Sequence, residues 1–148
     1  MSATAKAVQD ALPAVQSVQD YFTYQVNFAS LAAGASANGS FQVQADSDFK
    51  WLKATVMADL AGAAQTVSTQ VIPLVTIQIT DTGSGRQLMS APVPIFNMFG
   101  TGQIPFILPV PRIFKARANV AIAVANYSAA TAYLFRLSFI GTKIFRMG

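Results

Sequence analysis

Apolar and polar residues alternate with a period of two along most of this chain. The alternation is clearest in residues 22–28, and it is typical of a β-strand that buries one face. Further strands of this kind, or apolar runs of strand length, are expected at residues 41–45, 49–58, 71–80, 86–91, 113–117, 119–127 and 133–139. The pattern therefore predicts about eight strands and no long helix.

Short segments of small and polar residues separate these strands and predict turns. Asn38-Gly39 is a dipeptide favoured in tight hairpins, and residues 81–85 (DTGSG) form a second hairpin loop. Pro73 is expected at a strand start, an edge or a bulge, because proline cannot donate a hydrogen bond to a sheet. Many short strands with frequent turn signals predict an all-β fold: an antiparallel β-sandwich, most simply a jelly roll.

Two of the expected strands contain residues that predict how far the strand is buried. Val120, Ile122 and Val124 alternate with alanines rather than with polar residues, which predicts a strand that is covered on both faces. Trp51, the only tryptophan, is expected to be an anchor in the core or at the end of a sheet.

The segment from Pro92 to Pro111 contains five of the seven prolines together with Phe96, Phe99 and Phe106. It is too rich in proline for a central strand and too apolar for a solvated loop. Exposed apolar loops mark contact surfaces, so we expect these phenylalanines to contact a partner. The alternative is a loop that folds over one open end of the sandwich.

The first twenty residues lack strand-like alternation, and Pro13 interrupts what would otherwise be a short helix. Four apolar residues in this segment are nevertheless spaced to bury a stripe: Val8, Leu12, Val15 and Val18. We therefore expect an extended N-terminal arm at residues 1–20 that packs against a partner, followed by a single β-sandwich domain at residues 21–148.

Composition narrows the functional classes. The 148 residues include no Cys, no His and no Glu, so a Ser-His triad, a cysteine nucleophile and a thiolate or imidazole zinc site are excluded. We therefore expect no enzyme and no cofactor. Hydrophobic residues make up 53% of the chain and charged residues 11%, against about 25% charged in a typical soluble domain. No apolar run reaches the roughly 18 residues of a membrane helix, so we expect burial against neighbouring subunits and no membrane partner.

Charge is distributed unevenly along the chain. Residues 1–81 carry all six Asp and three Lys, whereas residues 82–148 carry seven Lys or Arg and no acid. This asymmetry suggests complementary contact between copies or with an acidic partner. The alternative is that cations at strand ends only keep a poorly charged surface soluble.

The densest basic group consists of Arg112, Lys115 and Arg117, with Phe114 between them. Three interpretations fit it. The cations and the ring could contact phosphates and a base of a nucleic acid, although three charges are few for that role. The cations could instead form salt bridges to an acidic neighbouring subunit, or they could mark the solvated start of a strand.

Two other groups of residues are candidates for ligand sites. Asp46 and Asp48 lie two residues apart, but calcium normally needs six to eight oxygens and no third acid lies near them in the sequence. Residues 83–86 (GSGR) lack the Lys-Ser/Thr ending and the following helix of a phosphate loop. We therefore expect a solvated turn and a hairpin, and no metal site.

The residues from Leu108 onward have a distinctive order of features. A proline-flanked entry leads to the pair Ile113-Phe114, an alternating strand ends in Asn126, and a Ser/Ala/Thr turn leads to an aromatic strand that closes in Gly-x-Lys-x-Phe at residues 141–145. This order resembles the C-terminal hairpin of small virion structural proteins of tailed bacteriophages. The resemblance implies a jelly-roll capsid decoration or cement protein on the outside of the head. Such a protein bridges subunits of the major capsid protein and often forms a homodimer or homotrimer.

The leading hypothesis is therefore a non-enzymatic capsid cement protein located on the exterior of the virion. Its expected contact residues are Val8, Leu12, Val15, Val18, Phe96, Phe99, Phe106, Arg112, Lys115 and Arg117. The alternative is a receptor- or glycan-binding module of a tail or fibre, with Trp51 near Asp48 and Lys50 as the only candidate platform. A binder of single-stranded nucleic acid ranks third, and nucleic acid is not among the partners that we expect.

Overall fold

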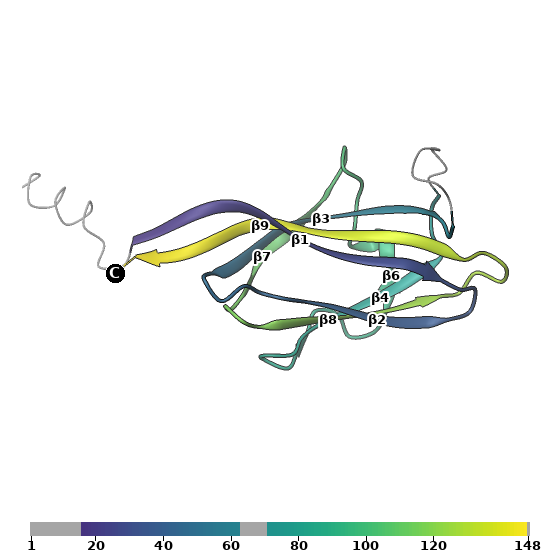
Figure 1. Ribbon diagram of the computed structural model, residues 1–148, viewed down its shortest axis with the longest axis horizontal. Helices are drawn as coiled ribbons and strands as arrows, with labels where there is room; N and C mark the ends of the chain where they lie inside the picture. The colour runs from purple at the N-terminus through teal and green to yellow at the C-terminus, as the bar shows by residue number, and fades with distance from the viewer. Residues whose placement is uncertain (1–15, 63–70, 148) are drawn as a thin grey trace, which may run out of the picture.

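The computed structural model of the protein describes residues 16–62 and 71–147, which form two antiparallel sheets packed face to face (Figure 1). Sheet A contains, in spatial order, β1 (Gln16–Leu31), β9 (Tyr133–Met147), β3 (Asp48–Leu60) and β7 (Phe106–Phe114). Sheet B contains β2 (Ser36–Gln42), β8 (Asn119–Asn126), β4 (Val75–Asp81) and β5 (Arg86–Gln87), and β6 (Val93–Pro94) also pairs with β4. A short 3₁₀ helix, η1 (Ile95–Asn97), follows β6.

The strands pair in a nested order: the first strand pairs with the last, the second with the second last, and so on inward along the chain. β1 pairs with β9, β2 with β8, β3 with β7, and β4 with both β5 and β6, all antiparallel. This nesting of first strand with last is the topology of a jelly roll. The all-β sandwich predicted from the sequence is therefore confirmed.

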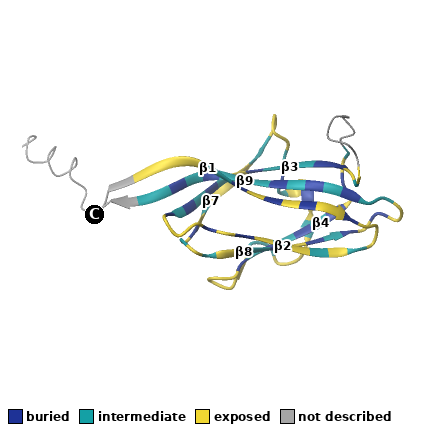
Figure 2. Ribbon diagram, viewed as in Figure 1, coloured by how far each residue is buried: buried dark blue, intermediate teal, exposed yellow. Residues whose placement is uncertain are grey.

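The core lies between the two sheets, and the period-two alternation decides which side chains enter it. Along β4 and β8 every second residue is buried, and Figure 2 shows the same alternation of colours along other strands. Phe139 of β9 is central to an aromatic cluster, with ring centroids 4.8 Å from Phe41 and 4.9 Å from Trp51. Trp51 is fully buried, and its Nε1–H donates to the carbonyl of Lys53 at 2.7 Å, so the predicted anchor is confirmed.

Two boundaries near the N-terminus differ from the prediction. Residues 16–20, which were assigned to the arm, are the first part of β1 and pair with the end of β9. Asn38 and Gly39 lie inside β2, so the hairpin prediction there was wrong; the turn before β2 contains Gly34, with φ of 72°. Gly39 faces the core, where a Cβ atom would come within 2.8 Å of Phe28 Cζ. Glycine at this position therefore allows close packing of the sheets rather than a turn.

The end of the proline-rich segment belongs to β7, the last strand of sheet A. β7 contains Pro109 and Pro111, and it lies at the edge of the sheet, where a proline removes no hydrogen bond from an inner strand. Between Ile107 and Arg112 the register with β3 is interrupted, so both prolines lie in the stretch that has no partner residue on β3. The prediction that this segment is not a central strand is confirmed, but the sequence predicted a loop here and not an edge strand.

Strand β8 is covered on one face only, which corrects the prediction of cover on both faces. Val120, Ile122 and Val124 are buried in the core, whereas Ala123 is exposed on the outside of sheet B. Alanine is small enough to be tolerated in solvent, so its apolar character did not indicate burial here.

Candidate interaction surface

Strand β7, at one edge of sheet A, exposes three aliphatic side chains. Its outward residues Ile107, Val110 and Ile113 are 65%, 77% and 50% exposed. Single exposed aliphatic residues are common, but several along one strand indicate a contact surface. We call these three residues the β7 row.

Six cations lie near the β7 row. Lys50 and Lys53 of β3 are the pairing partners of Ile113 and Ile107, and the other four line two hollows. Arg112 is on β7 itself, Arg86 is on β5, and Lys115 and Arg117 are in the turn that follows β7. Two hollows of about 320 Å³ each connect these positions: Arg86, Arg112 and Lys115 line one, and Lys115 and Arg117 line the other. The structure thus brings together the three basic residues identified from the sequence and adds Arg86 to them.

Only one of these cations has an ion-pair partner among the described residues. Lys115 Nζ lies 3.7 Å from Asp48 Oδ2, and no ion pair within residues 16–62 and 71–147 involves Arg86, Arg112 or Arg117. Asp81 lines both hollows, where its carboxylate offsets one positive charge, and its Oδ1 accepts a hydrogen bond from the backbone N–H of Gly83 at 3.1 Å. Three arginines beside this one carboxylate leave a net positive charge on this side of the described part of the chain.

Arg117 occupies a backbone position that normally favours glycine. Its φ is 69°, in the turn closed by the hydrogen bond from Ala118 N–H to the carbonyl of Lys115 at 3.0 Å. This conformation costs a residue with a Cβ atom about 1–2 kcal/mol. Two further bonds hold the residue in place: its N–H donates to Val43 at 2.9 Å, and its carbonyl accepts from Gln42 Nε2 at 3.2 Å. The turn directs a long cationic side chain outward at the expense of backbone strain.

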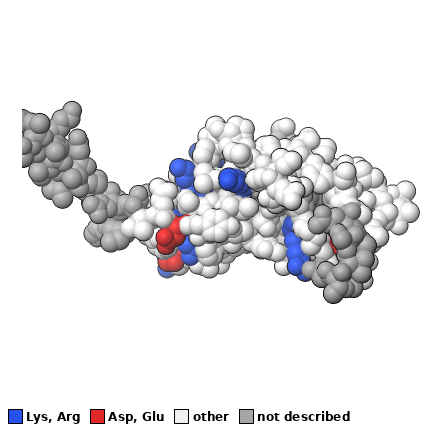
Figure 3. Space-filling view, turned by 90° about the horizontal axis from the view of Figure 1, so that it is seen from above, with Lys and Arg blue, Asp and Glu red and all other residues white. Residues whose placement is uncertain are grey.

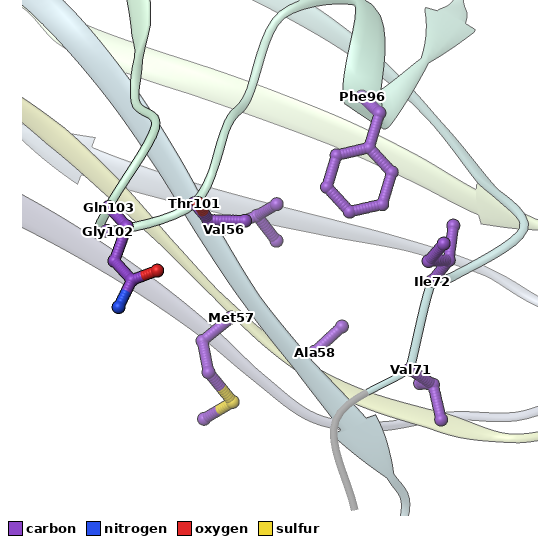
Figure 4. A pocket seen from close by; sticks show the side chains of 9 residues that line it. All are labelled: Val56, Met57, Ala58, Val71, Ile72, Phe96, Thr101, Gly102 and Gln103. Carbon is purple, nitrogen blue, oxygen red and sulfur yellow. The ribbon is translucent and has the colours of Figure 1, made fainter.

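A separate depression, of about 590 Å³, lies beside β3 (Figure 4). It is bordered by Phe96 and Ile72 on one side and by Gln103 on the other, with Val56 and Met57 of β3 between them. None of the described residues that line it is acidic or basic, so they offer surface for apolar contact and no group for proton transfer.

The predicted aromatic contact residues have different environments. Phe96 is 40% exposed, in agreement with a contact role, and Phe106 is half-buried at the start of β7. Phe99 is 0% exposed, with its ring centroid 5.6 Å from that of Phe139, so it belongs to the core and its assignment to a contact surface was wrong. The sequence could not separate Phe96 from Phe99, because both lie in the same irregular apolar segment.

The arm residues are described only in part. Val8, Leu12 and Val15 lie outside the described residues, so their expected contacts stay predictions. Val18 lies in β1, opposite Phe145 of β9, and its side chain is exposed. Figure 1 shows that this part of β1 and β9 projects beyond the other strands of sheet A.

Burial removes the aromatic platforms that two of the alternatives require. Trp51 is fully enclosed in the core, so it cannot stack on a sugar ring, and the proposed glycan platform is wrong. Phe114 is equally buried, so the basic cluster has no exposed ring between its cations to stack on a base. Among residues 16–62 and 71–147, no group of acids or other ligands is suited to hold a metal ion.

Charge is sparse on the outer face of sheet A, which Figure 3 shows from above. Lys and Arg form separate small groups there on a mostly uncharged surface. In the described ranges of the chain, no helix is long and apolar enough to cross a membrane.

The sequence reasoning missed the β7 row and Arg86. The signal for the row was present, because Ile107, Val110 and Ile113 flank two prolines that already pointed to an exposed edge. Arg86 lies far from the other cations in sequence and joins them only through the pairing of β5 with β4.

No model of a protein family matches this chain, and no curated protein matches it in sequence. The VP2 subviral particle of infectious bursal disease virus matches 86% of this chain with a TM-score of 0.36 and 10% identity. The Gt strain of the same virus matches 89% with a TM-score of 0.29 and 10% identity. The chain spans 32% and 37% of the length of these two proteins.

Proposed function

We propose that this chain is a structural virion protein: a capsid decoration or cement protein that binds the outside of a tailed-phage head and bridges subunits of the major capsid protein. In this role it performs no catalysis and needs no cofactor. The observation that carries the proposal is the side of the sandwich at β7, where the exposed aliphatic row lies beside three arginines without a described acidic partner.

The residues that carry the resemblance to phage virion proteins support the same surface. They run from Leu108 to Phe145 and form most of β7, all of β8 and most of β9. The Ile113-Phe114 pair of that pattern divides between surface and core, because Ile113 is half exposed and Phe114 is buried. Strand β7, which contains this pair, thus contributes one side chain to the core and one to the proposed contact.

The chemistry of the β7 side fits an acidic and partly apolar partner surface. The aliphatic side chains supply apolar area that binding removes from water. Each arginine supplies a planar guanidinium that donates two parallel hydrogen bonds to one carboxylate. Many copies on one shell would each need only modest affinity if every copy bridges two subunits.

The test is co-sedimentation with heads that were assembled without this protein by the phage that encodes it. We expect the double variant Arg112→Asp/Arg117→Asp to lose attachment, and attachment of the unaltered chain to weaken as salt is raised, because exposed charge pairs are screened. The matched control is Arg136→Asp, which reverses a charge on β9, outside the β7 side. Full attachment of the double variant, with the fold confirmed by circular dichroism, would contradict the assigned surface.

The role of the arm needs a deletion that spares β1. Removal of residues 1–15 leaves the whole of β1, whereas removal of residues 1–20 would also delete five residues of the sheet. If Val8, Leu12 and Val15 contact the capsid, the shorter deletion lowers attachment and leaves the melting temperature unchanged. Unchanged attachment would remove the arm from the proposed interface.

A further inference from the structure

Strand β1 is a long edge strand that uses only one of its two edges. It pairs with β9 over most of its sixteen residues, and no other described strand pairs with it. No backbone hydrogen bond to another described element is found along its second edge. Such an edge presents a row of free N–H and C=O groups that can pair with another chain.

The hydrogen bonds elsewhere in sheet A show which residues of β1 face this free edge. Val56 of β3 donates its N–H to the carbonyl of Gly100 at 2.8 Å, so its backbone groups point away from β9. Leu137, its partner on β9, must then point toward β1, because facing residues of an antiparallel pair point both inward or both outward. Leu137 faces Val26, so the even residues of β1 bond to β9. The odd residues direct their N–H and C=O groups outward.

The outward set contains Tyr21, Thr23, Gln25 and Asn27. Their side chains point to the outer face of sheet A and carry no charge. They bond to one another rather than to the edge: Thr23 Oγ1 lies 2.9 Å from Tyr21 Oη, and Gln25 Nε2 donates to Asn27 Oδ1 at 2.9 Å. The backbone groups at this edge are therefore left uncovered by the side chains beside them.

The two edges of sheet A differ in the features that prevent strand pairing. β7, at the far edge, contains Pro109 and Pro111, which lack an N–H and so block a regular ladder. β1 contains no proline, lysine or arginine, and its one charged residue is Asp20. Proteins commonly protect free edges with proline and lysine, so an unprotected edge of this length indicates a paired one.

We propose that two copies of this chain pair through their β1 strands, antiparallel and related by a two-fold axis at Gln25. Around this axis Thr23 of each copy lies opposite Asn27 of the other, and the three outward residues Thr23, Gln25 and Asn27 form six backbone hydrogen bonds. The two copies of sheet A then continue as one sheet across the interface. The partner surface is isologous, as expected for a homodimer.

A second copy fits this edge better than an unrelated strand for two reasons. The odd residues of one copy meet the odd residues of the other, so every outward N–H around the axis faces an outward C=O. The pairing also brings no like charges together, because Asp20 comes opposite Ser30 and the two Asp20 side chains lie about 33 Å apart at ~3.3 Å per residue. That separation is several Debye lengths at physiological salt.

The test measures the mass of the full chain by light scattering and analytical ultracentrifugation over a range of concentrations. We expect a dimer, and we expect Gln25→Pro to weaken dimerisation at least ~100-fold. The N–H removed by proline points away from β9, so the fold is retained. The matched control Gln25→Thr keeps the N–H and should dimerise like the unaltered chain. A monomer at all concentrations, or a dimer insensitive to Gln25→Pro, would overturn the proposal.

A second pair of variants tests the register even if proline disturbs the strand. Thr23→Lys/Asn27→Lys places lysines opposite lysines across the proposed axis, and it should abolish the dimer. Thr23→Lys/Asn27→Asp places opposite charges there, and it should retain the dimer. In amide exchange, the N–H groups of Thr23, Gln25 and Asn27 should be protected in the dimer and exposed in Gln25→Pro. Equal behaviour of the two double variants would exclude this register.

This inference deepens the self-association expected in the proposed function but does not depend on capsid binding. The β1 edge and the β7 side are the two opposite edges of sheet A. A chain that attaches to heads yet remains a monomer in solution would overturn the dimer alone. A chain that dimerises but does not attach would overturn the cement function alone.

Discussion

Phe96 and Phe99 lie at and just after η1, three residues apart, and their replacement by alanine separates a surface residue from a core residue. Phe99 is fully buried and makes an edge contact with Phe139 at an interplanar angle of 85°. Loss of a buried phenylalanine costs about 3–5 kcal/mol, because transfer free energy is lost and a cavity remains. Aromatic pairs add about 0.5–1.5 kcal/mol beyond burial. We therefore expect Phe99→Ala to lower the free energy of unfolding by about 4 kcal/mol.

Phe96→Ala is the matched control, because the same atoms are removed from a ring that is 40% exposed instead of fully buried. Full burial of such a side chain contributes about 1.5–3 kcal/mol, so the loss at this position should be about 1 kcal/mol. Urea unfolding followed by the fluorescence of Trp51, the only tryptophan, measures both values. In the assay with phage heads the order should reverse, with Phe96→Ala reducing attachment more per folded molecule. Equal losses of stability in the two variants would refute the assignment of Phe99 to the core.

Three further predictions concern packing and buried polar groups. Gly39→Val should destabilise the fold by more than about 2 kcal/mol, because its Cβ would lie 2.8 Å from a side chain on β1. The neighbouring control Asn38→Val should be nearly neutral, and thermal unfolding compares the two variants. Asn126→Ala should cost about 2–4 kcal/mol in urea unfolding, because the buried Nδ2 donates to the carbonyls of Leu31 and Thr131 at 3.0 and 2.8 Å. Asp46→Asn should destabilise the fold more than Lys143→Met. Asp46→Asn leaves the buried ammonium of Lys143 without its carboxylate at 3.2 Å, whereas Lys143→Met removes the buried charge itself. A smaller loss of stability for Asp46→Asn would contradict this order.

Much of the fold could be predicted because its strands bury one face. Alternation identified the strands that became β1, β3, β4, β8 and β9, and the frequency of turns indicated a sandwich. These signals are local, since each strand carries its own pattern of inward and outward residues. The jelly-roll pairing itself is not local, but a chain with this number of strands has few other ways to cover both sheets.

The errors arose where a residue acts through a distant neighbour. Gly39 resembles a hairpin glycine in sequence, yet it is required by Phe28 on another strand. Phe99 resembles Phe96 until the chain returns through η1 and places one ring against Phe139. The prolines of β7 argued against a central strand in the sequence, but only the pairing of β7 with β3 shows that the β7 row lies at the edge of sheet A.

The nested pairing also explains what becomes of the uneven charge. A strand near the start of the chain pairs with one near its end, so acids of the first half meet cations of the second half within the same molecule. Asp48 lies 3.7 Å from Lys115, and Asp46 lies 3.2 Å from Lys143. These pairs need no second copy, which removes part of the expected charge complementarity between copies. The arginines on the β7 side form no such ion pair in the described residues. The attraction to an acidic partner therefore comes from these arginines and not from the net charge of the chain.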